Sequence, residues 1–201
     1  MSDPYFDKVY KARSEEETRA LYDGWAATYE QAMADEGYAT PGRCAQALRA
    51  LMPDSAAPIL DFGCGSGLSG LALRLAGFSV IDGVDLSPGM LDRARDKGVY
   101  RSLAPIGPGD PVPEGYAAIA AIGVIGAGAA PLAALDRIFD ALAPGAKCVF
   151  SFNDHTLEDP AFEGRIDALI ADGTLRQLFR EHGPHLPGKN IGSTVYVLEK
   201  A

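Results

Sequence analysis

Apolar segments typical of strands alternate with helical segments from residue 58 to residue 153. The apolar runs at residues 58–62, 78–84, 99–103, 117–122 and 146–152 predict strands, and helices are expected at residues 68–76, 88–98 and 131–142. Strands and helices that alternate in this way favour a parallel sheet with helices on both faces. We therefore expect an α/β, Rossmann-like fold.

Helical and mixed segments flank this alternating region. Before it, four residues recur at helical spacing in a helix that fades near Gly37: Tyr22, Trp25, Tyr29 and Met33. Thr40 and Pro41 then read as an N-cap and the first position of a helix that runs to about Met52. After it we expect a helix at residues 160–172, an ambiguous segment at 174–180 and a β-rich segment at 193–199. No boundary divides the 201 residues, so we expect one domain.

Composition excludes several classes of protein. The net charge of −9 disfavours binding to nucleic acid. Three distant cysteines (Cys44, Cys64 and Cys148) suit free thiols in a reducing compartment, so we expect a cytoplasmic protein. Residues 116–135 carry no charge, but glycines and a proline interrupt them, so we expect no membrane span. We also expect no metal site, since Gly183 and Pro184 break the helix that His182 and His185 would need.

The stretch Asp61-Phe62-Gly63-Cys64-Gly65-Ser66-Gly67 lies between the first predicted strand and its helix, where open parallel sheets bind ligands. Glycines there allow a close approach of the backbone, and the helix offers N–H groups to a negative ligand group. Two cofactors use such a loop. Residues 65–70 match the Gly-x-Gly-x-x-Gly dinucleotide pattern, and Asp85 stands 18 residues beyond Gly67, near the expected position of a ribose-binding acid. An NAD-dependent oxidoreductase is therefore one interpretation.

Three features favour S-adenosylmethionine over NAD. A carboxylate at Asp61 suits the ammonium of a methionyl group and is unfavourable beside a pyrophosphate. About 57 residues precede the first strand, whereas a dinucleotide domain commonly begins at that strand. The pair Tyr196 and Lys200 lies in a β-rich run, where residues four apart are about 13 Å from each other, too far to cooperate as a dehydrogenase pair.

The motifs resemble those of class I S-adenosylmethionine-dependent methyltransferases. Residues 59–67 resemble their first motif, residues 83–91 their second, and residues 142–146 the turn before their fifth strand. Residues 22–29 (Tyr-Asp-Gly-Trp-Ala-Ala-Thr-Tyr) resemble the N-terminal segment of the Williams–Beuren-region methyltransferase-like subgroup. The resemblance implies a mostly parallel, seven-stranded sheet. It also implies that residues 1–57 form an N-terminal helical lid on a Rossmann-like core of residues 58–201.

The resemblance also implies which residues bind the cofactor. Asp85 would accept both ribose hydroxyls, since a carboxylate has two acceptor oxygens. Leu86, Met90 and Ile106 would contact the adenine, although core packing explains Met90 nearly as well. The remaining expected contacts are with Tyr22, Trp25, Tyr29, Asp61, Gly63, Cys64, Gly65, Gly67 and Ile122. Alternatives stay open: the aromatic residues suit plain helix packing, Asp61 suits a structural hydrogen-bonding role, and Cys64 is expected to be a small buried residue.

The sequence leaves the methyl acceptor open. The fourth strand lacks the Asn/Asp-Pro-Pro-aromatic signature of enzymes that methylate nucleobases, so we expect a small-molecule acceptor and a monomer or homodimer. His155, after the fifth strand, is a weak candidate for a general base, because a loop histidine is more often solvated. An alternative is a protein that binds S-adenosylmethionine or S-adenosylhomocysteine without transferring a methyl group. An NAD-dependent oxidoreductase is the third interpretation.

Overall fold

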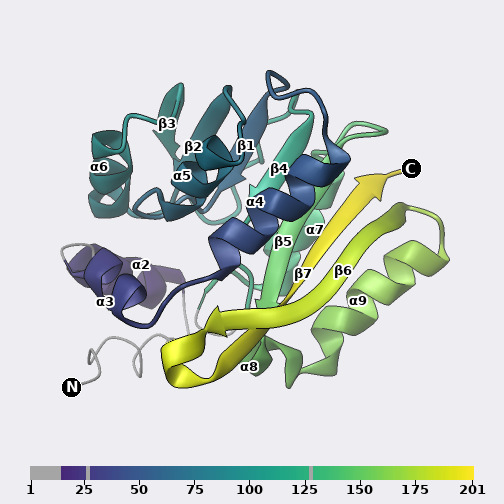
Figure 1. The fold of residues 1–201 in the computed structure, drawn as a ribbon. Coiled ribbons are helices and arrows are strands. Elements are labelled where there is room, and N and C mark those ends of the chain that lie inside the picture. Colours follow the sequence, from purple (N-terminus) through teal and green to yellow (C-terminus); the bar gives the residue numbers. More distant parts are fainter. Residues whose placement is uncertain (1–14, 26–27, 127–128) are drawn as a thin grey trace.

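The computed structural model describes residues 15–25, 28–126 and 129–201. Its centre is a seven-stranded sheet with the strand order β3-β2-β1-β4-β5-β7-β6 (Figure 1). Strands β1 to β5 pair in parallel, and β7 is antiparallel to both β5 and β6. The expected mostly parallel, seven-stranded α/β sheet is therefore confirmed.

The strands are β1 (Ile59–Phe62), β2 (Ile81–Asp85), β3 (Ser102–Pro105), β4 (Ala118–Ala121), β5 (Lys147–Asn153), β6 (Leu175–Leu186) and β7 (Ile191–Lys200). The helices are α2 (Glu15–Trp25), α3 (Tyr29–Asp35), α4 (Thr40–Leu51), α5 (Leu68–Leu75), α6 (Pro88–Asp96), α7 (Leu132–Asp140), α8 (Asp154–Leu157) and α9 (Pro160–Ala171). A short 3-10 turn, Pro187–Lys189, joins β6 to β7. The ambiguous segment after residue 173 is thus a strand, because it pairs along β7.

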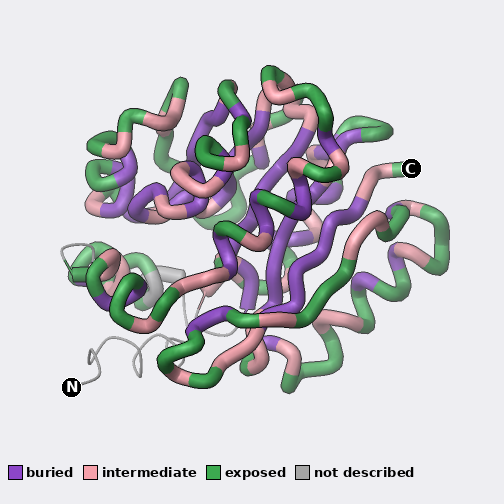
Figure 2. The backbone as a smooth tube through the Cα atoms, viewed as in Figure 1, coloured by how far each residue is buried: buried purple, intermediate pink, exposed green. Residues whose placement is uncertain are grey.

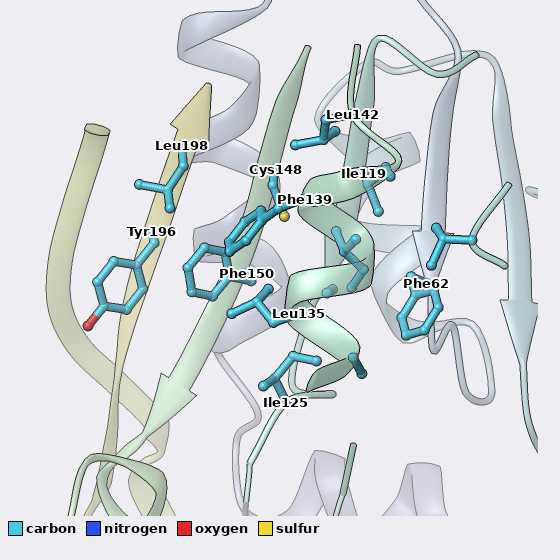
Figure 3. Packing of buried hydrophobic residues seen from close by; sticks show 14 of the residues in the cluster. Phe62, Ile119, Ile125, Leu135, Phe139, Leu142, Cys148, Phe150, Tyr196 and Leu198 are labelled. Carbon is cyan, nitrogen blue, oxygen red and sulfur yellow. The ribbon is translucent and has the colours of Figure 1, made fainter. Parts of the chain in front are cut away.

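Alternating side chains of the central strands form two cores, one on each face of the sheet. On β5, Phe150 packs with α7 and α9, whereas its neighbour Val149 packs with α4 and α5. Figure 3 shows the first core, in which Phe150 stacks on Tyr196 of β7 with ring centroids 4.9 Å apart. The buried strands lie between half-exposed helices (Figure 2). Helices on both faces are what the alternating pattern predicted.

Helices α2 and α3 lie apart from these layers, at the edge toward which the parallel strands run (Figure 1). Trp25 and Met33 are buried there with Leu186 of β6. This arrangement places an aromatic helix pair over the carboxyl ends of the strands, where parallel sheets bind their ligands.

Four sequence-based boundaries need correction. Strand β2 begins at Ile81 rather than at Phe78. The aromatic segment forms two helices, α2 and α3, rather than one. Strand β3 begins at Ser102, three residues later than expected, because Tyr100 turns inward to bond Asp61. Thr40 is not an N-cap: Ala39 holds that position, and the Thr40 hydroxyl bonds His185 and Ser193 instead.

The uncharged segment at residues 116–135 contributes β4, a loop and the start of α7, as expected. Within the described ranges, no helix is long and apolar enough to cross a membrane. The buried strand β4 accounts for the low charge of this segment, since it is covered on both faces.

Candidate functional site: two adjoining cavities at the carboxyl edge of the sheet

Two cavities lie where the parallel strands end. The larger, about 160 Å³, extends over the glycine loop, and the smaller, about 60 Å³, extends toward β5 and β6. Five residues line both cavities: Tyr22, Tyr29, Tyr38, Gly123 and Ala129. The two cavities therefore adjoin beneath the aromatic helices, and we call them the first and the second cavity.

The glycine loop forms the floor of the first cavity. Gly63, Gly65 and Gly67 have φ values of +68°, +52° and +94°, which side chains rarely tolerate. A Cβ atom at Gly63 would lie 2.6 Å from a methyl carbon of Val124. These glycines are thus required by the loop conformation and, at Gly63, by the close approach of Val124 in the loop that follows β4.

Asp85 ends β2 and faces the first cavity with both carboxylate oxygens already anchored. Its Oδ2 accepts from the Gly65 N–H at 2.8 Å, and its Oδ1 accepts from the Ser87 N–H at 2.9 Å. Burial raises the pKa of this carboxyl, and the two bonds partly offset that effect. Each oxygen keeps a lone pair for a further donor, so Asp85 can accept two ligand hydroxyls.

Asp61 lies beneath the loop rather than in the cavity wall. Its side chain is fully buried, and its Oδ2 accepts from the hydroxyls of Ser69 and Tyr100, both at 2.7 Å. Burial raises its pKa to about 6. No described residue donates to Oδ1, and a buried carboxylate oxygen without a donor is costly. Asp61 therefore combines the structural hydrogen-bonding role with one open acceptor site.

Tyr100 also explains the last glycine of the dinucleotide-like pattern. A Cβ atom at Gly70 would lie 2.2 Å from the Tyr100 hydroxyl, which accepts from the Gly70 N–H at 3.1 Å and donates to Asp61. Gly70 thus makes room for an aromatic side chain. Tyr196, of the expected but distant Tyr-x-x-x-Lys pair, is 1% exposed in the core. Neither observation favours an NAD-dependent oxidoreductase.

Polar contacts with α6 and its N-cap hold the aromatic helices α2 and α3 over the first cavity. The Asp23 carboxylate accepts from the Ser87 hydroxyl and, at 3.3 Å, from the Gly89 N–H. Lys97 donates to Glu30 of α3 at 2.5 Å. Ser87 itself is the N-cap of α6 and accepts from the Met90 N–H. Helix α2 therefore docks on the same turn that carries Asp85.

Most of the sequence-predicted site residues meet at the first cavity. Its lining includes Tyr22, Tyr29, Gly63, Cys64, Gly65, Asp85, Leu86, Met90, Ile106 and Ile122. Trp25 lines only the second cavity, where its ring contacts that of Tyr29 at 5.0 Å. Asp61 and Gly67 support the loop from behind, since neither lines a cavity. Cys64 is 2% exposed and burial raises its pKa, as expected of a small buried residue.

The structure does not bring His155 to the site. Its side chain is 44% exposed, pairs with Glu158, the C-cap of its own helix, at 3.5 Å and lines neither cavity.

The histidine that does line the second cavity is His185, which the sequence suggested only as a possible metal ligand. Tyr38, Asn153 and Arg137 were also missed, because no local motif marks them. Among the described residues, no cluster of three potential metal ligands occurs.

The residues of the first cavity fit S-adenosylmethionine. Asp85 lines the cavity and offers acceptors for ribose hydroxyls. Asp61 lies behind the glycine loop and does not line the cavity, so its contact with the ammonium stays a prediction. Ser66 Oγ also lacks a described partner and lies in a residue that lines the cavity. Leu86, Met90 and Ile106 supply apolar walls for a base. The fold and this site together place the protein in the class of S-adenosylmethionine-dependent methyltransferases.

Comparison with known proteins agrees with this class. A family model described as a methyltransferase domain matches residues 36–192. The human methyltransferase-like protein 27 is 34% identical over 161 residues, covering 76% of this chain and 66% of that protein, so this chain spans just under two thirds of its relative. The chain belongs to the methyltransferase domain family.

Solved structures show the same fold at low sequence identity. The putative methyltransferase in complex with the Trm112 methyltransferase activator of Haloferax volcanii is 20% identical, with a TM-score of 0.65 over 94% of this chain and 99% of that chain. Magnesium protoporphyrin IX methyltransferase from Synechocystis, solved with bound S-adenosylmethionine, is 13% identical, with a TM-score of 0.58 over 98% and 90% of the two chains. These likenesses concern the fold alone.

Proposed function

We propose that this chain transfers the methyl group of S-adenosylmethionine to a small-molecule acceptor. The observation that carries the proposal is the pair of adjoining cavities: one suits the cofactor, and the other opens from it beneath Tyr22, Tyr29 and Tyr38. A cavity of about 60 Å³ holds a small group rather than a polymer. The net charge of −9 also disfavours a nucleic-acid acceptor.

The chain's own residues bind, orient and enclose the reactants. When bound, the cofactor supplies a methyl group that its sulfonium makes reactive. Asp85 and the Gly65 N–H fix the geometry of the loop, and buried Asp61 supports it from behind through Ser69 and Tyr100. The aromatic side chains of α2 and α3 exclude water from the junction of the cavities. Alignment of the two reactants is then the main contribution of the protein.

Calorimetry tests cofactor binding, and a screen of small-molecule acceptors with S-adenosylhomocysteine as readout tests transfer. We expect S-adenosylmethionine and S-adenosylhomocysteine to stabilise the protein in thermal unfolding and NAD to leave it unchanged. Binding without any transfer across a broad acceptor screen would favour a binding protein that lacks activity. Stabilisation by NAD alone would overturn the proposal. The cytoplasmic location and the monomeric or homodimeric state remain predictions from the sequence.

A further inference from the structure

His185, at the end of β6, is a buried histidine whose ring lines the second cavity. It is 7% exposed and packs edge-on against Tyr38, with ring centroids 5.2 Å apart. Its Nδ1 atom lies 2.8 Å from the Thr40 hydroxyl. No residue in the described part of the chain bonds its Nε2 atom. One ring nitrogen is therefore held by the protein, and the other is open.

A chain of hydrogen bonds that starts at Arg43 sets the position of the proton on this ring. Arg43 Nη1 donates to Ser193 Oγ at 3.1 Å, and Ser193 Oγ lies 2.9 Å from Thr40 Oγ1. A guanidinium can only donate, so Ser193 Oγ accepts from it. Among the described residues, only Thr40 Oγ1 can then accept the hydroxyl proton of Ser193, so Ser193 donates to Thr40. Thr40 then donates to His185 Nδ1. This sequence of bonds leaves the proton of the neutral ring on Nε2, as a donor toward the cavity.

The neutral ring is favoured by its surroundings. Burial lowers the pKa of His185 to about 4, and the charge of Arg43 acts in the same direction. Asp154 acts in the opposite direction, but its carboxylate already accepts from the His182 ring at 2.9 Å and from the Gly192 N–H at 2.6 Å. His185 is therefore a hydrogen-bond donor near neutral pH, rather than a cation or a base.

Asn153, at the end of β5, supplies a second donor to the same cavity. Its Oδ1 caps helix α8 by accepting from the Thr156 N–H at 2.9 Å and from the Thr156 hydroxyl at 3.0 Å. Because a backbone N–H must face oxygen, these bonds fix the amide orientation and leave Nδ2 as the open end. No described residue accepts from Nδ2.

The second cavity thus offers two donors and no competing acid. Its described lining includes no aspartate, glutamate, lysine or arginine, and its other walls are largely aromatic or aliphatic. Arg43 lies directly behind Ser193, so the nearest fixed charge on the donor chain is positive. Two N–H donors match the two oxygens of a carboxylate, and at His185 the charge of Arg43 partly offsets that of Asp154.

We infer that the second cavity binds a carboxylate of the methyl acceptor, with His185 Nε2–H and Asn153 Nδ2–H as the two donors. The inference deepens the proposed function, because it assigns the acceptor to small carboxylic acids. His185 and Asn153 are specificity-determining residues in this assignment, and Thr40, Ser193 and Arg43 are positioning residues that hold the His185 tautomer.

Nitrogen NMR of the histidine rings tests the tautomer without any ligand. The chain has three histidines, so the His185 signals are identified by their loss in His185→Phe. We expect the Nε2–H form near neutral pH in the wild type, and a gain of the Nδ1–H form in Thr40→Val. A wild-type ring that is protonated on Nδ1, or on both nitrogens, would overturn the inference.

Calorimetric titration with benzoate and its neutral isostere benzamide, with S-adenosylhomocysteine present, tests the ligand class. We expect benzoate to bind more tightly than benzamide, and His185→Phe to weaken benzoate about tenfold or more, the effect of losing a hydrogen bond to a charged group. Asn153→Asp keeps the cap of α8 but replaces the donor with a negative oxygen, and it should abolish benzoate binding. His155→Gln, at an exposed histidine that lines neither cavity, is the matched control and should bind benzoate as the wild type does.

The two proposals fail in different ways. If S-adenosylhomocysteine does not bind the wild type, the proposed function fails, whereas benzoate titration of the protein alone still tests the donor pair. If His185→Phe and Asn153→Asp weaken S-adenosylhomocysteine itself, the donors hold the cofactor's own carboxylate, and the inference about the acceptor is overturned. Equal binding of benzamide and benzoate would overturn it as well.

Discussion

The two cavities are assembled in different ways, although they share an edge of one sheet. The first depends on a glycine loop and on Asp85, whose bond to Gly65 spans 20 residues. The second depends on contacts between distant segments: Thr40 bonds His185 across 145 residues and Ser193 across 153. The polar contacts of the first cavity join neighbouring strands and turns, whereas those of the second join distant segments. This difference explains why a sequence motif marks the first cavity and none marks the second.

The largest effect is expected from Asp85→Ala, which tests whether the first cavity depends on one anchored carboxylate. The variant loses the acceptor for Gly65 and Ser87 as well as for the ligand hydroxyls. Hydrogen bonds to a charged group contribute about 1.5–3 kcal/mol each, so affinity for S-adenosylhomocysteine should fall about 100-fold or more by calorimetry.

Asp92→Ala removes an exposed carboxylate of α6 that pairs with Arg95, and it serves as the control for Asp85→Ala. It should bind S-adenosylhomocysteine like the wild type. Unchanged affinity in a folded Asp85→Ala protein would contradict the assignment of Asp85 to the ribose.

The second cavity should make stability depend on pH through His185. Its pKa is lowered from 6.5 to about 4, so the unfolded chain binds more protons between these values. The contribution of His185 is therefore complete above pH 6.5 and is lost as the pH falls toward 4, by at most about 3 kcal/mol. Denaturant unfolding at several pH values, compared between the wild type and His185→Phe, measures this loss.

Asp61 has the opposite dependence, which is why the comparison with a His185 variant is needed. Its pKa is raised to about 6, so its contribution is present below pH 3.8 and is lost as the pH rises through 6. Identical pH slopes for the wild type and His185→Phe would show that His185 titrates normally in the folded protein.

Gly70→Ala tests the support of the glycine loop. The new Cβ would lie 2.2 Å from Tyr100, whose hydroxyl holds Asp61, so the unfolding free energy should fall by about 2 kcal/mol. Gly164→Ala in α9 meets nothing within 4 Å and should instead stabilise the protein by about 0.5–1 kcal/mol. A stable Gly70→Ala protein would mean that Tyr100 has another position open to it.

The smallest effect is expected from Asp23→Ala, which loosens the aromatic helices over both cavities. The variant loses the contacts with Ser87 and Gly89, so cofactor affinity should fall by about fivefold, or about 1 kcal/mol. Asp35→Ala removes an exposed carboxylate of α3 that bonds Gln31, and its affinity should be unchanged. If both variants bind equally well, α2 does not close the first cavity.

The sequence by itself determined the fold class, the parallel direction of the central strands and the position of the cofactor loop. These features depend on local periodicity and on glycines with positive φ. The positions of Gly63, Gly65 and Asp85 follow from one strand, one turn and the next strand. Tertiary structure decided the rest. Asp61 faces Tyr100 rather than the cavity, Thr40 bonds His185 rather than capping its helix, and His155 points to solvent. Contacts between side chains more than a hundred residues apart depend on the strand order and on packing. No local sequence pattern predicts such contacts.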